Sequence, residues 1–174
     1  MTGFIQHAKE LGFDEASTIK PRILQSREDV RGMCAADKCG AYGKNWTCPP
    51  ACGTLEQCQK KMNSYHNGLL LQTVGHMTKD IDSRCYRETE KKHNEALRVL
   101  WQTIKNHYPE ALCLGAGGCR ICKKCTYPEP CRFPDKAMPS MEAYGLFVTQ
   151  VCKDAGIDYH HGERTITYTA CILF

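Results

Sequence analysis

Apolar residues recur along the chain with two different periods, one typical of helices and one typical of strands. The N-terminal segment has the helical period, and Gly12 follows it as a stop signal. Its apolar face consists of Phe4, Ile5, Ala8 and Leu11. We therefore expect a short amphipathic helix at the start of the chain.

Three further segments predict helices, at residues 54–65, 83–107 and 140–155. The first of them begins with Thr54 and Gln57, which have the spacing of a capping box. The second is long, and its expected buried stripe consists of Leu97, Leu100, Trp101 and Ile104. The third begins at Ser140, and Gly156 is expected to end it. Its inner face is Met141, Tyr144, Val148, Val151 and Ala155.

Four apolar stretches predict strands, at residues 16–24, 68–76, 111–115 and 165–174. Pro21 confines the first to an edge or a bulge, because proline has no N–H for a strand ladder. The third is short and apolar, and we expect it to be central. Alternating strands and helices indicate an α/β fold, with α+β as the alternative. The expected architecture is one domain, residues 1–174, with a small mixed sheet of about four strands and flanking helices.

Composition makes cysteine chemistry the central question. The chain has 174 residues, 13 of them cysteine, and a formal charge of +4. No secretory stretch opens it and no run of about 18 apolar residues crosses a membrane, so we predict a cytoplasmic protein with reduced thiols. The odd cysteine count also disfavours a disulfide framework. No long basic tract with interleaved aromatic residues indicates nucleic-acid binding.

The stretch "GAGGCRICKKCTYPEPCRFP", residues 115–134, has the strongest metal signal. Cys119, Cys122 and Cys125 follow the C-x-x-C-x-x-C spacing that wraps three corners of a 4Fe–4S cluster. Zinc sites more often use two separated C-x-x-C pairs. Cys131 is the predicted fourth ligand, and Cys48, which precedes two prolines, is the alternative.

An earlier stretch, "CAADKCGAYGKNWTCPPACG", supplies a second candidate site. Its predicted ligands are Cys34, Cys39, Cys48 and Cys52. The spacing is irregular, so this is a weaker signal than the later stretch. The other cysteines are interpreted as small buried side chains, and the histidines have no metal-binding spacing. These cysteines are Cys58, Cys85, Cys113, Cys152 and Cys171.

The motifs "CGAYGKNWTCPP" and "LGAGGCRICKKCTYPEPCRFPDKAMPSMEAYG" resemble domain-of-unknown-function family 2284, from about residue 30 to residue 174. The family consists of cysteine-rich bacterial and archaeal proteins that are common in anaerobes and described as metal-binding. The resemblance implies metal at both cysteine-rich segments. Its shared thiols correspond to Cys34, Cys39 and Cys48, and to Cys119, Cys122, Cys125 and Cys131. Cys52 departs from the family pattern, so the resemblance leaves the fourth ligand of the first site open between Cys52, Cys58 and no cysteine.

Three functions follow from these motifs. The first is electron transfer through two 4Fe–4S clusters, with basic residues around the cysteines steering an acidic redox partner. The second is an enzyme, such as a desulfidase, dehydratase or reductase, in which a three-cysteine cluster leaves one iron open to a small molecule. The third is a structural module that binds zinc, since four thiolates suit that ion too.

Overall fold

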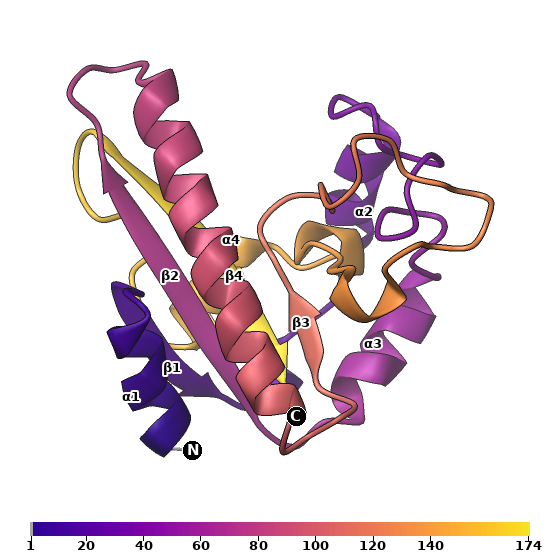
Figure 1. Cartoon of the computed structure of the whole chain (residues 1–174), viewed down its shortest axis with the longest axis horizontal. Coiled ribbons are helices and arrows are strands. Elements are labelled where there is room, and N and C mark those ends of the chain that lie inside the picture. The colour runs from indigo at the N-terminus through magenta and orange to yellow at the C-terminus, as the bar shows by residue number, and fades with distance from the viewer. Residues whose placement is uncertain (1) are drawn as a thin grey trace.

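The computed structural model describes residues 2–174 and contains five α-helices and four strands in that range. Figure 1 shows their arrangement along the chain. Their bounds are α1 (Thr2–Glu10), β1 (Glu15–Ile19), α2 (Glu28–Ala35), α3 (Leu55–Asn63), β2 (Gly68–His76), α4 (Ser83–Lys105), β3 (Leu112–Leu114), α5 (Val148–Asp154) and β4 (Thr165–Leu173). The predicted α/β class with a small sheet is confirmed.

The four strands form one sheet in the order β1-β2-β4-β3. Each neighbouring pair of strands is antiparallel. The prediction of a mixed sheet is therefore wrong. The longest pairing joins β2 to β4, from Gly68 opposite Leu173 to His76 opposite Thr165. The prediction that the strand at 111–115 is central is also wrong, because β3 lies at an edge. Its apolar character comes from burial on both faces rather than from two flanking strands.

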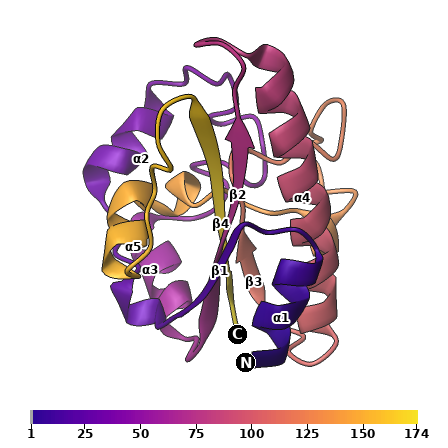
Figure 2. The same ribbon diagram turned by 90° about the vertical axis from the view of Figure 1, so that its left-hand side faces the viewer.

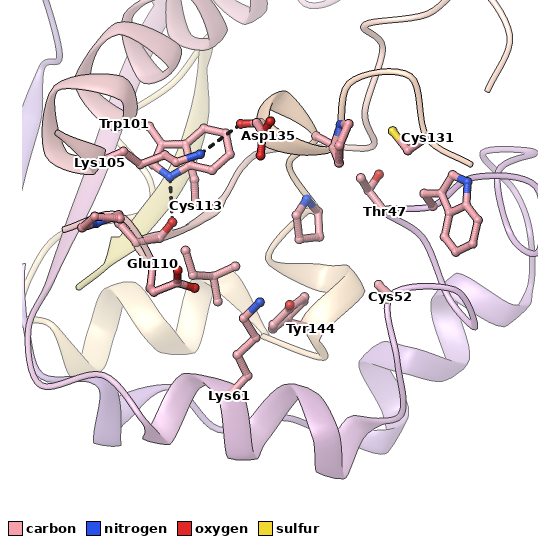
Figure 3. Close-up of a pocket in the computed structure, with 17 residues that line it drawn as sticks. Thr47, Cys52, Lys61, Trp101, Lys105, Glu110, Cys113, Cys131, Asp135 and Tyr144 are labelled. Atoms are coloured by element: carbon pink, nitrogen blue, oxygen red, sulfur yellow. Dashed lines mark hydrogen bonds between the residues drawn. The ribbon is translucent and has the colours of Figure 1, made fainter. Parts of the chain in front are cut away.

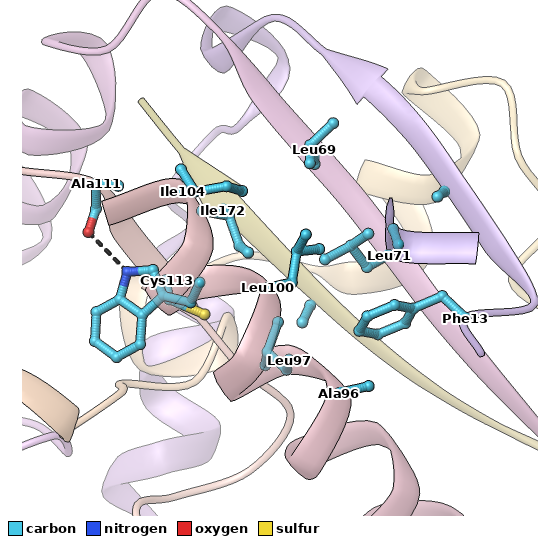
Figure 4. Close-up of a cluster of buried hydrophobic side chains, with 14 of the residues drawn as sticks. Phe13, Leu69, Leu71, Ala96, Leu97, Leu100, Ile104, Ala111, Cys113 and Ile172 are labelled. Atoms are coloured by element: carbon cyan, nitrogen blue, oxygen red, sulfur yellow. Dashed lines mark hydrogen bonds between the residues drawn. The ribbon is translucent and has the colours of Figure 1, made fainter. Parts of the chain in front are cut away.

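Helices cover both faces of the sheet. Figure 2 shows α1 and α4 on one side and α2, α3 and α5 on the other. Successive side chains of β2 therefore pack into two different hydrophobic cores, one on each face of the sheet. Leu69 and Leu71 pack in the first core, with α1 and α4, and Leu70 packs in the second core, with α3 and α5. Figure 4 shows α4 contributing Leu97 and Leu100 to the first core. Burial on both faces explains why β2 is an apolar run without alternation.

The helix at residues 54–65 begins as predicted. The Thr54 hydroxyl accepts a hydrogen bond from the Gln57 N–H at 3.2 Å, and the Gln57 side chain accepts one from the Thr54 N–H at 2.9 Å. These two bonds form the capping box at the start of α3. Cys58 and Met62 lie on the buried face of this helix.

Three segments differ from prediction. The strand at 16–24 ends at Ile19, because a short 3-10 helix begins at Pro21. The helix expected at 140–155 is broken at Gly145, whose φ is +76°, so only α5 is an α-helix there. Helix α2 was not predicted. It places Cys34 in its last turn, so the first cysteine-rich segment begins on a helix.

The cysteine-rich segments lie beyond the β3 edge of the sheet, where Figure 1 shows the chain around residue 45 beside the chain around residue 125. Strand β3 leads directly into the later segment, as predicted. Within residues 2–174, no helix has the length and apolar character needed to cross a membrane.

Candidate metal centre

We call residues 34–53 the first loop and residues 115–134 the second loop. Three consecutive residues of the first loop hold the second in place. The Asn45 amide donates to the Cys119 carbonyl oxygen at 3.2 Å, and the Trp46 ring N–H donates to the Glu129 carbonyl oxygen at 2.8 Å. The Thr47 hydroxyl accepts a hydrogen bond from the Cys119 N–H at 3.3 Å. The two loops are therefore parts of one structure, although more than 60 residues separate them in the sequence.

Four cysteines line a cavity of about 390 Å³ between the loops. Cys34, Cys39 and Cys48 come from the first loop, and Cys119 comes from the second. A Cβ atom added to Gly118 would lie 3.6 Å from the Cys48 sulfur, in ordinary van der Waals contact, so the second loop packs beside this thiol. We call this space the first thiol cavity.

Four cysteines also line a smaller cavity under the second loop. They are Cys119, Cys122, Cys125 and Cys131, the four thiols that the sequence predicts for this loop. This second thiol cavity has a volume of only about 20 Å³, which is room for about one water molecule. Cys119 lines both cavities, so the two candidate sites are neighbours.

Burial affects the protonation of the thiols that line the first thiol cavity. It raises the pKa of the Cys34 and Cys48 thiols above the ordinary value. The carboxylate of Glu142 raises the pKa of Cys34 further, and the neighbouring Cys39 raises that of Cys48. A metal that binds there must therefore displace protons from these thiols, so binding weakens as the pH falls.

None of the cysteines forms a disulfide within the described range, residues 2–174. In the same range, no three His, Cys, Asp or Glu side chains converge closely enough to hold a single metal ion. The thiols instead surround spaces. The donor set of the first thiol cavity fits a polynuclear cluster, whose ligands are spread around an inorganic core. The second has four thiolate donors, but its space is smaller than a core of four irons and four sulfides.

Cys52 does not line the first thiol cavity, although the sequence predicts it as a ligand there. It lies one turn beyond Cys48, and its N–H donates to the Cys48 carbonyl oxygen at 3.1 Å. Its thiol donates to the Ala143 carbonyl oxygen at 3.5 Å and contacts Cys58. The position expected for Cys52 is occupied by Cys119, which no spacing rule assigns to the first loop.

Cys52 faces a third and larger cavity, of about 500 Å³, shown in Figure 3. Its walls combine aromatic rings with the charged side chains of Lys61 on α3, Lys105 on α4, Glu110, and Asp135 just after the second loop. Sequence analysis missed this cavity, because its residues are scattered and follow no motif. Trp101 and Tyr144 are among its aromatic lining residues.

The five cysteines that the sequence analysis interprets as core residues are buried or half-buried in the structure. Cys58, Cys113, Cys152 and Cys171 are buried, and Cys85 is half-buried on α4. His93 is fully buried against Thr73 rather than near the loops, with 2.9 Å between the Thr73 hydroxyl and Nδ1. The candidate chemistry is therefore concentrated in the two loops.

A small α/β fold with two docked, thiol-lined loops defines a cysteine-rich protein of the metal-binding class. The chain belongs to DUF2284, a family described as predicted metal-binding protein, whose model matches residues 17–174. The resemblance noted from the loop motifs is thereby confirmed. No curated protein matches the chain.

Two solved structures are similar in part. Epoxyqueuosine reductase from Bacillus subtilis has a TM-score of 0.46 and 11% sequence identity. A selenomethionine-labelled epoxyqueuosine reductase has a TM-score of 0.45 and 10% identity. Each match covers 98% of this chain and 44% of the other, so the chain spans less than half the length of these proteins.

Proposed function

We propose that this protein binds two 4Fe–4S clusters between its loops and serves in electron transfer. The observation that carries the proposal is that the two thiol cavities adjoin and share one cysteine. Seven thiols line them: Cys34, Cys39, Cys48, Cys119, Cys122, Cys125 and Cys131. When bound, such clusters supply reversible one-electron transfer.

The proposed ligands of the first thiol cavity are Cys34, Cys39 and Cys48, with Cys119 as the fourth. In two-cluster ferredoxins, one cysteine of each binding run likewise ligates the other cluster. The loop-to-loop hydrogen bonds at Asn45 and Thr47 support this assignment, because they fix the Cys119 backbone against the first loop.

Iron is preferred to zinc for two reasons. The run from Cys119 to Cys125 has three thiols at two-residue intervals, which suits cluster corners better than the paired ligands of zinc. The thiols of the first thiol cavity also surround a space of about 390 Å³ rather than converging on one point.

An acidic redox protein is the proposed partner. Arg120, Lys123, Lys124 and Arg132 are exposed on the second loop beside the thiols. A positive collar of this kind steers an acidic surface toward the site and speeds its association at low ionic strength.

One observation favours a second candidate function. Two all-cysteine cubanes need eight thiolates, and the cavities offer seven. With Cys119 assigned to the first cavity, the second keeps three thiols of its own. A cluster held by three thiolates has an iron open to substrate, so the second candidate is an enzyme that acts on a small molecule there.

Metal analysis of protein purified without oxygen tests the proposal. We expect about eight irons and about eight sulfides per chain, the content of two cubanes. Cys119→Ser is expected to lower both, while Cys85→Ser, a matched change outside the loops, keeps them. Stoichiometric zinc without iron or sulfide contradicts the proposal. A change in the electron paramagnetic resonance signal on adding a small thiol identifies an open iron and favours the enzyme.

A further inference from the structure

The 500 Å³ cavity lies directly against the second thiol cavity. Four residues line both of them: Trp46, Thr47, Cys131 and Ala137. Cys131 is one of the four thiols of the second thiol cavity, so it stands at the boundary between the two spaces. A small molecule bound in the larger cavity would therefore lie beside a proposed metal ligand.

The two ends of this larger cavity differ in chemical character. Figure 3 shows Lys105 and Glu110 toward one end of it. Thr47 and Cys131 lie toward the other end, and Tyr144 lies between the two ends. The cavity thus has a charged end at α4 and a second end at the cysteine-rich loops.

Lys105 supplies a positioned cation at the charged end. Its Nζ lies 4.8 Å from the centre of the Trp101 ring and donates to the Asp135 carbonyl oxygen at 3.3 Å. The Trp101 ring is itself fixed, because its N–H donates to the Ala111 carbonyl oxygen at 2.9 Å. Within residues 2–174, no carboxylate forms an ion pair with the Lys105 ammonium. Its remaining N–H donors can bind the carboxylate of a ligand.

Glu110 supplies the opposite charge at the same end. Its backbone is held by Tyr65, whose hydroxyl donates to the Glu110 carbonyl oxygen at 2.7 Å. No cation of the described part of the chain forms an ion pair with its carboxylate. Lys61 and Asp135 add one further charge of each sign, so the walls are neutral overall. Walls that carry both signs suit a ligand with both an ammonium and a carboxylate group.

The remaining walls suit an apolar group. Tyr144 is 5% exposed, so its ring is held firmly in the fold. Trp46 donates its ring N–H to the Glu129 carbonyl oxygen, and its ring packs edge-on against Tyr127 with 5.0 Å between the ring centres. These side chains offer ring surface, and an aromatic group of a ligand packs favourably on such surface.

We propose that the 500 Å³ cavity binds a free amino acid with an aromatic side chain. Its carboxylate contacts Lys105, its ammonium contacts Glu110, and its side chain extends past Tyr144 toward Cys131. The volume is within the range of small-molecule sites, about 300–1,000 Å³. The role of this amino acid as a substrate rests on the second candidate function, whereas its binding does not.

Isothermal titration calorimetry of the metal-loaded chain, purified without oxygen, tests the site. Four probes are compared: L-phenylalanine, 3-phenylpropionate, which lacks the ammonium, 2-phenylethylamine, which lacks the carboxylate, and L-alanine, which lacks the ring. We expect L-phenylalanine to bind at least about tenfold more tightly than each of the others, because each of them loses one contact. Absence of L-phenylalanine binding, or equal affinities for all four probes, overturns the inference.

Two variants test the contacts with the charged groups. Lys105→Met is expected to weaken L-phenylalanine binding by about tenfold without weakening that of 2-phenylethylamine, which has no carboxylate. Glu110→Gln should weaken L-phenylalanine binding by about the same factor without weakening that of 3-phenylpropionate. Lys91→Met and Glu95→Gln, changes to an exposed ion pair on α4 outside the cavity, are the controls and should affect no probe. Equal weakening of both probes by either cavity variant overturns the contact assigned to that residue.

Tryptophan fluorescence tests where the probe binds. The chain has two tryptophans, Trp46 and Trp101, and both line this cavity. L-phenylalanine should therefore change the fluorescence with the same Kd that calorimetry gives. Binding heat without a change in fluorescence places the probe elsewhere and overturns the inference.

Iron analysis of the same samples separates this inference from the proposed function. L-phenylalanine binding by a chain that carries zinc and no iron supports the inference and contradicts the proposed function. A full iron content without L-phenylalanine binding supports the proposed function and overturns the inference.

Discussion

Cysteines that look alike in the sequence have different roles according to what surrounds each one. Cys52 and Cys119 illustrate this at the residue scale. The sequence predicts Cys52 as a ligand because it follows Cys48 in the same loop, but it faces a different cavity. Cys119 begins a local C-x-x-C-x-x-C run, yet it also reaches the first thiol cavity. Spacing describes how a loop wraps locally, and it carries no information on which distant loop packs against it.

The Thr54 cap is a residue-scale feature that the sequence does reveal, because both capping-box partners lie within four residues. Thr54→Ala removes the acceptor for the Gln57 N–H, so we expect it to lower the free energy of unfolding by about 1 kcal/mol. Chemical denaturation measures the change. Thr149→Ala on α5, an exposed threonine, serves as the control and should shift stability by less than about 0.5 kcal/mol. Equal losses in both variants contradict the role assigned to the cap.

His93 gives a prediction for the pH dependence of stability. Burial lowers its pKa to about 4, below its ordinary value of about 6.5. Above pH 6.5 the ring is neutral in both states. As the pH falls below 6.5, the unfolded chain takes up a proton that the folded chain refuses, so folding loses about 2 kcal/mol by pH 5.

Replacement of His93 tests this linkage. In His93→Gln, we expect the free energy of unfolding to fall less between pH 7.5 and pH 5 than in the wild type, by about 2 kcal/mol. Denaturation curves at both pH values measure the difference. His66→Gln, which changes an exposed histidine, should retain the wild-type profile. An unchanged slope in His93→Gln shows that His93 is not the group responsible.

For helices and strands, the sequence predicts the bounds of long segments well. It predicts poorly the order of strands in the sheet and where a helix breaks. The bounds of β2 agree with prediction because its apolar run begins after Asn67 and ends at the polar His76. The position of β3 at an edge was missed because a three-residue strand says nothing of strand order. The break before α5 was missed because the helical apolar period continues through Gly145, while the backbone there turns left-handed.

The packing of α4 against β2 requires a glycine at position 75. A Cβ atom there would meet the Thr89 hydroxyl and lie 2.9 Å from Ile166 Cγ2 and 3.0 Å from the Cys85 sulfur. We therefore expect Gly75→Ala to destabilise the protein by about 1–3 kcal/mol. Gly32→Ala on α2 is the matched control, because a Cβ there meets nothing within 4 Å.

The two glycine variants should shift stability in opposite directions. Gly32→Ala is expected to raise the free energy of unfolding by about 0.5–1 kcal/mol, because alanine favours helix more than glycine does. Urea denaturation of both variants measures the contrast. A neutral Gly75→Ala shows that α4 can move away from the sheet, contrary to the close packing described above.

At the scale of the whole molecule, helices cover both faces of the sheet, and the thiol-lined loops that we propose to bind metal lie beyond one edge. The sheet contributes β3, which leads directly into the second loop. The first loop is held at its ends by α2 and α3, and Asn45, Trp46 and Thr47 fasten it to the second. Such long-range docking brings the seven thiols together, and it is the part of the site that local sequence patterns do not encode.

Anomalous X-ray diffraction at the iron absorption edge, from crystals grown without oxygen, would locate bound iron among the thiols. We expect two separate iron maxima, one at each thiol cavity, with Cys119 between them. Iron density should be bounded by Cys34, Cys39 and Cys48 on one side and by Cys122, Cys125 and Cys131 on the other. A zinc signal in place of iron, or disulfide bonds among these cysteines, would contradict the account.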